Sequence, residues 1–135
     1  MNHIKKYTLA IFFFSSFTMS AQSSNVSLLN NSLKAMQPLS VKDIDSDVYV
    51  SLNAASVTPE IYEEATQAVC MPIWLKKNDS YLKDIKSVFI RNKFSYSGYA
   101  FDEPRVACQK AGDEQPEQSK VTIMSHTRLF TNKGN

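Results

Sequence analysis

Histidine is nearly absent from this chain of 135 residues, which contains His3, His126 and no other. A zinc site needs several ligands from histidine, cysteine or carboxylate at a recognisable spacing. A serine or cysteine nucleophile needs a base such as histidine, held by a third group. Because His126 is the one candidate base outside the N-terminal region, the sequence predicts no cofactor and no metal site, and it favours a protein that is not an enzyme.

Glycine is equally scarce and occurs at Gly98, Gly112 and Gly134. A loop that cradles phosphate needs glycines close together, so the chain has no nucleotide-binding loop of that kind. Carboxylate pairs of the glycosidase type depend on spatial separation, on which a sequence is silent. The hydrolase alternative therefore stays open, with His126 and either Asp102 or Glu103 as its candidates.

Cysteine is limited to Cys70 and Cys108, which lie too far apart in the sequence for a redox-active pair. They predict one structural disulfide that closes a loop of 38 residues (108 − 70). In the chain-entropy model this stabilises the fold by roughly 4 kcal/mol. The alternative is two buried free thiols, which an oxidising compartment disfavours.

Long apolar runs are missing, apart from residues 7–19, which Lys5 and Lys6 precede and Ser20-Ala21 follow. This is the layout of a secretory signal peptide, and the run is shorter than the ~20 residues that span a bilayer. We predict a signal peptide at residues 1–21, a single domain at residues 22–135, and no membrane insertion after cleavage. The mature protein is expected to be exported to a periplasmic or extracellular location.

An excess of one charge is also missing once the signal peptide is removed. The chain has 15 Lys and Arg against 13 Asp and Glu, and Lys5 and Lys6 leave with the signal, so 13 − 13 gives a net charge of 0. The apparent basicity belongs to the export signal. The sequence therefore predicts no nucleic-acid partner.

Two helices are indicated in the first half of the mature chain. Apolar spacing predicts one over residues 25–37, ended by Pro38. Thr58-Pro59 is a strong start for a second, which carries Cys70 near its end. Residues 40–55 are ambiguous, because their apolar spacing is helical but Val48, Val50 and Leu52 alternate as in a strand. We favour helix there, since the helical pattern is longer.

The second half is predicted to be an antiparallel sheet. A hairpin joins strands 86–91 and 94–102 through a turn at Asn92-Lys93, and a bulge at Ser97-Gly98 brings four aromatic residues onto one face. Further along we expect a short extended piece at 105–108, an exposed loop at 111–120 and a last strand at 121–130. The predicted fold class is α+β, with N-terminal helices packed on a small antiparallel sheet of about three strands, and one disulfide. The four aromatic residues are Phe94, Tyr96, Tyr99 and Phe101.

Basic residues are concentrated between positions 76 and 93, where six of them face Asp79 and Asp84 for a local charge of +4. An ordinary solvated surface explains such a run. A basic face that docks an acidic partner also explains it. Interleaved aromatic residues fit a saccharide as well, while Trp74 is expected to fill core beside the disulfide. The candidate partner-binding residues are Lys76, Lys77, Lys83, Lys86, Arg91 and Lys93.

These observations predict a small exported non-catalytic protein that binds another exported protein, as an inhibitor, an immunity-type factor or an envelope adaptor would. The size, the single disulfide, the missing active-site groups and the segregated charge all favour this function. The alternatives are the small secreted hydrolase and a structural subunit of a surface assembly.

Overall fold

Residues 38–52 form a β-hairpin where we expected a helix. Strand β1 (Pro38–Ile44) pairs antiparallel with β2 (Asp47–Leu52), and Asp45 takes a left-handed conformation in the turn, with φ of 54°. The helix prediction for residues 40–55 is wrong. The alternation of β-branched residues was the signal that mattered, because it buries one face of β2.

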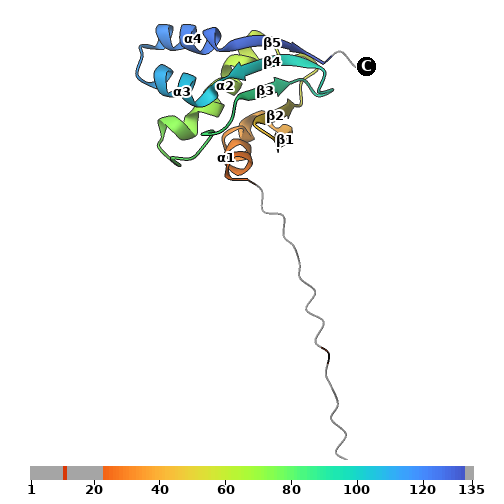
Figure 1. The fold of residues 1–135 in the computed structure, drawn as a ribbon. Helices are drawn as coiled ribbons and strands as arrows, with labels where there is room; N and C mark the ends of the chain where they lie inside the picture. The colour runs from red at the N-terminus through yellow and green to blue at the C-terminus, as the bar shows by residue number, and fades with distance from the viewer. Residues whose placement is uncertain (1–10, 12–22, 133–135) are drawn as a thin grey trace, which may run out of the picture.

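The computed structural model describes Ile11 and residues 23–132 (Figure 1). The predicted signal peptide, except for Ile11, lies outside the described residues. Five strands form one sheet in the order β1-β2-β3-β4-β5, in which β2 and β3 are parallel and the other neighbours antiparallel. The chain is α+β as predicted, but the sheet has five strands instead of about three and is mixed. The helices are also distributed along the whole chain rather than confined to its N-terminal half.

The first helix, α1 (Ser24–Ser32), is capped by the Ser23 hydroxyl and followed by a 3-10 turn at Lys34–Met36. The long helix α2 (Pro59–Trp74) begins as predicted, with the Thr58 hydroxyl accepting the Ile61 N–H. It connects the parallel strands β2 and β3, which a short turn cannot join.

The predicted hairpin exists, but its details differ. Strands β3 (Ser87–Arg91) and β4 (Ser97–Asp102) are joined by residues 92–96, and the Asn92 side chain accepts the N–H groups of Tyr96 and Ser97. Gly98 pairs in regular register with Arg91, so the predicted bulge and the tight Asn92-Lys93 turn are both wrong. Because there is no bulge, the four aromatic residues do not share a face: Phe94 and Tyr96 are exposed at the turn, and Tyr99 and Phe101 point to the core.

Two helices occupy the region predicted as an extended piece and a loop. Helix α3 (Pro104–Gly112) and helix α4 (Pro116–Ser125) each begin at a proline, and β5 (Thr127–Thr131) is the short remainder of the predicted last strand. Those predictions are wrong because the prolines act as helix starts, where proline costs no hydrogen bond. Helix α3 buries Ala107, Cys108 and Ala111.

The Cys70–Cys108 disulfide is confirmed, with a Cα–Cα distance of 5.1 Å. It joins α2 to α3, and not a helix to a hairpin as the sequence suggested. Around it lies one hydrophobic core that takes residues from α1, α2, α3 and one face of the sheet. Among the described residues, no helix is both long and apolar enough to cross a membrane.

Candidate binding surface

The second face of the sheet carries a continuous row of side chains that the core does not use. Tyr49 on β2 opposes Phe89 on β3, Phe89 opposes Ala100 on β4, and Ala100 opposes Arg128 on β5. Directly opposed residues project to the same face of a sheet. Phe89 and Ala100 are buried, yet neither belongs to the hydrophobic core cluster. We call this surface the open face and define it by five residues: Tyr49, Phe89, Arg91, Arg128 and Phe130.

Three aromatic rings are stacked on the open face. The Tyr49 and Phe89 rings lie 4.8 Å apart between centroids and are nearly parallel, at 7°. Phe130 meets Phe89 edge-on at 5.1 Å, although one strand separates them. The intervening strand presents only Gly98 and Ala100 there, so side chains of β5 can lean across β4. The rings therefore form one connected layer.

Two arginines lie against these rings. The Arg91 guanidinium is 5.1 Å from the centre of the Tyr49 ring, and that of Arg128 is 5.5 Å from the centre of Phe89. Such cation–π contacts gain strength where water is excluded. Each arginine is thus held in a defined position by a flat aromatic surface.

The two arginines differ in their charge partners. Arg128 donates to the Asp102 carboxylate at 2.8 Å, and Ser87 also donates to that carboxylate. Arg91 donates to the Ser51 hydroxyl at 3.0 Å but makes no ion pair with any described residue, and its buried Nε has no hydrogen-bond partner there. Burial lowers the pKa of Arg91, an effect that the nearby Tyr49 opposes. Arg91 is therefore a positioned cation with donor capacity to spare.

The structure separates the six basic residues predicted as a binding site. Lys86 precedes the first residue of β3 and Arg91 is its last, so their Cα atoms lie roughly 16 Å apart. Lys76 and Lys77 follow the end of α2, and Lys83 lies in the turn before β3. Only Arg91 belongs to the open face, and Lys93 lies in the turn just beyond it, with its ammonium 5.1 Å from the Phe94 ring.

Sequence reasoning missed three of the five open-face residues: Tyr49, Arg128 and Phe130. It predicted Arg91 as a binding residue and counted Phe89 among the aromatic residues interleaved with the basic run. A signal did exist, since Asp47, Tyr49 and Ser51 are the outward set of a strand whose inward set is Val48, Val50 and Leu52. The helical apolar spacing over residues 40–55 obscured this alternation. Nothing local in the sequence indicates that β5 lies next to β4.

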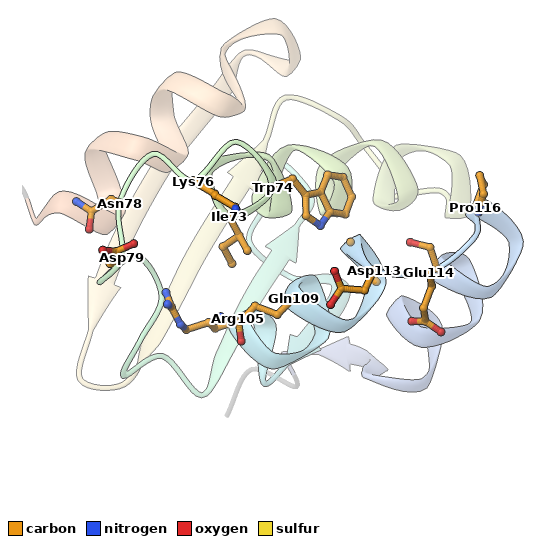
Figure 2. Close-up of a pocket in the computed structure, with 13 residues that line it drawn as sticks. Ile73, Trp74, Lys76, Asn78, Asp79, Arg105, Gln109, Asp113, Glu114 and Pro116 are labelled. Atoms are coloured by element: carbon orange, nitrogen blue, oxygen red, sulfur yellow. The ribbon is translucent and has the colours of Figure 1, made fainter.

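A hollow of about 830 Å³ lies between the end of α2 and helices α3 and α4, and it contains Lys76 (Figure 2). Trp74 forms part of its wall, half-buried, with the indole N–H donating to the Cys108 carbonyl at 2.8 Å. This agrees with a core role beside the disulfide. Figure 2 shows Asp113 and Glu114 at one end of the hollow and Arg105 and Asp79 towards the other. The lining is therefore polar and of mixed charge.

The candidate residues of the hydrolase alternative do not form a dyad. The Nδ1 of His126 lies 3.2 Å from the backbone carbonyl of Asp102, whose carboxylate binds Ser87 and Arg128 instead. Glu103 is exposed, at the N-terminal end of α3. Within residues 23–132 and Ile11, no cluster of His, Cys, Asp and Glu could hold a metal ion.

No protein-family model, curated protein or solved structure matches this chain.

Proposed function

We propose that this protein is a non-catalytic exported binding protein whose open face docks an acidic segment of another exported protein. One observation carries the proposal: Arg91 is fixed on an aromatic ring, partly desolvated, and has no carboxylate partner among the described residues. A carboxylate from a partner would supply what this guanidinium lacks, and arginine can bind it with two parallel hydrogen bonds.

The composition of the open face supports a protein partner. Tyrosine, tryptophan and arginine are the residues that most often dominate binding energy at protein interfaces. The rings of Tyr49 and Phe89 already stack on each other, and Phe89 is only 8% exposed. A surface whose rings are engaged in this way offers a flat, rigid patch, whereas nucleobases require free ring faces on which to stack.

Charge on the open side of the sheet also favours an acidic partner. Lys42, Arg91 and Arg128 oppose Asp47 and Asp102, so this side has an excess of one positive charge. Lys93 adds a further cation at the adjacent turn. Complementary charge raises the association rate and disfavours partners that are themselves basic.

The formed disulfide supports export. Both cysteines of the chain are engaged in it, and structural disulfides persist mainly in oxidising compartments. A small domain with one disulfide and the open face would suit an inhibitor, an immunity-type factor or an envelope adaptor.

The test compares capture by the wild-type chain and by Arg91→Gln. A protein retained from envelope or culture extract at low salt is identified, purified and titrated against both chains. We expect Arg91→Gln to weaken binding at least about tenfold, since losing one partner of a buried, hydrogen-bonded charge pair costs ~2 kcal/mol or more. Arg91→Lys keeps the charge but loses the fork geometry, so it should fall between them.

Lys77→Gln is the matched control, because it removes one positive charge just after α2, away from the open face. It should bind as the wild type does. Equal affinity of wild type and Arg91→Gln for every purified candidate, with both chains folded, would overturn the proposal.

A second candidate function, saccharide binding, is favoured by the hollow beside Trp74. Its size is in the range of small-ligand sites, and an indole with amide and carboxylate neighbours suits a sugar ring. Because Trp74 is the single tryptophan of the chain, its fluorescence reports on this hollow. Saturable changes on adding glucose or N-acetylglucosamine oligomers, weakened by Gln109→Ala, would support it; an unchanged spectrum at millimolar sugar would refute it.

A further inference from the structure

Strand β5 forms one edge of the sheet and pairs on a single side, with β4 (Figure 1). The N–H of Asp102 donates to the carbonyl of His126, and the N–H of Asn132 donates to that of Tyr96. Since hydrogen bonding alternates along an antiparallel strand, the even-numbered residues of β5 face β4. The backbone groups of Thr127, Leu129 and Thr131 therefore point outward, towards a position that no described strand fills.

The central residue of this edge is also its most exposed apolar side chain. Leu129 is 78% exposed, the highest value among the large apolar residues of the described chain. It projects to the core side of the sheet, opposite Tyr99. An exposed leucine beside unpaired outward backbone groups is the arrangement that invites another strand to pair.

The sequence of β5, Thr-Arg-Leu-Phe-Thr, is self-complementary when read antiparallel about Leu129. In that register Thr127 opposes Thr131 of a second copy, Arg128 opposes its Phe130, and the two leucines oppose each other. No like charges meet, and each Arg128 is already neutralised by its own Asp102. Threonine pairs and an arginine over an aromatic ring are favourable cross-strand neighbours.

The other edge of the sheet carries features that oppose such pairing. Strand β1 begins with Pro38, its register is irregular between Pro38 and Ser40, and it presents adjacent charges at Lys42 and Asp43. Proline, irregular register and edge charges are the usual means of preventing strand addition. Strand β5 has no proline and no irregularity in its pairing.

We propose that two copies of this chain associate through antiparallel pairing of β5 with β5, about a two-fold axis at Leu129. Such an interface is isologous, because the same strand serves on both sides. It extends the open face across the axis, placing Arg128 of one copy against the aromatic layer of the other. The dimer stands apart from the proposed partner function, whose test depends on Arg91.

Cysteine scanning tests the register directly. The native cysteines are joined to each other, so Leu129→Cys introduces the sole free thiol. Opposed residues of a hydrogen-bonded antiparallel pair have Cα atoms about 5.5 Å apart, within the range of a disulfide. We expect Leu129→Cys to form a covalent dimer under mild oxidation at least about tenfold faster than Leu39→Cys, a matched control on β1 that is 56% exposed.

Sedimentation of the chain without added cysteine provides the second measurement. The wild type should be a dimer at ~100 µM, and Leu129→Lys, which opposes two charges at the axis, should be a monomer. Leu129→Lys should still melt as the wild type does at a dilution where both chains are monomeric. Equal cross-linking rates for Leu129→Cys and Leu39→Cys, or a wild type that remains monomeric at that concentration, would overturn the proposal. Neither the cross-linking rate nor the sedimentation depends on Arg91. Failure of the partner-binding test would therefore leave the dimer proposal standing.

Discussion

Gly98 is the residue whose identity the sheet fixes most strictly. A Cβ at this position would lie 1.9 Å from the carbonyl oxygen of Ile90, a backbone atom that cannot rotate away, and the φ of 157° is one that side chains rarely adopt. Gly98→Ala should therefore lower the free energy of unfolding by about 2 kcal/mol or more.

Urea unfolding measures this effect, and the neighbouring Ser97→Ala is the control. That substitution should change stability by no more than about 0.5 kcal/mol, as is usual away from special backbone positions. If Gly98→Ala were as stable as Ser97→Ala, this would contradict the close approach of Gly98 on β4 to the Ile90 carbonyl on β3.

Two buried tyrosines should make the protein sensitive to alkali. Burial raises the pKa of Tyr62 and of Tyr81 well above the ordinary value of about 10, although the hydrogen bond to Thr127 partly offsets this for Tyr62. Above pH ~10 the unfolded chain loses protons that the folded chain keeps. Stability should then fall by about 1.4 kcal/mol per pH unit for each tyrosine.

Denaturant unfolding between pH 9 and pH 11.5 checks this prediction. Tyr81→Phe should reduce the slope of stability against pH by one tyrosine's share, even though it also removes the bond to the Val69 carbonyl. A slope identical to that of the wild type would contradict the prediction.

At the scale of elements, the disulfide acts between two helices. Helices α2 and α3 come from separate parts of the chain, and the Trp74 indole bonds to the Cys108 carbonyl beside the link. Replacing both cysteines with serine should lower the free energy of unfolding by roughly 4 kcal/mol. The unfolded chain gains entropy when the disulfide no longer closes a loop of 38 residues. Thermal unfolding followed by Trp74 fluorescence measures it, and a shift below ~1 kcal/mol would contradict the entropic argument.

For the whole molecule, the uneven charge predicts salt-dependent association. Residues 22–135 carry no net charge, so electrostatic steering would come from the local excess on the open side. The association rate with an acidic partner should therefore fall by about tenfold from 50 to 500 mM salt. Stopped-flow mixing at several salt concentrations measures this rate. A rate independent of salt would indicate that the contact is apolar rather than electrostatic.

Much of the fold could be predicted where a signal is local. Thr58-Pro59 starts α2, apolar spacing marks α1, and residues 87–102 form a hairpin. The predictions for residues 40–55 and 104–125 were wrong for opposite reasons. In residues 40–55, helical and alternating patterns coincide. In residues 104–125, the short amphipathic helices bury too few residues to show a period, and their prolines resemble loop signals.

The sequence by itself determined the disulfide, because two cysteines allow one pairing. It also determined how few histidines and glycines the chain has for a catalytic or phosphate-binding site, because side chains that are absent cannot be positioned. It could not locate the open face. Tyr49, Phe89 and Arg128 lie about 40 residues apart along the chain, and they meet only because β2 pairs in parallel with β3, and β5 pairs with β4. Strand order results from burial of the opposite face against the helices, which is a non-local choice. The tertiary structure therefore decided that Arg91, alone among the six predicted basic residues, lies on the open face.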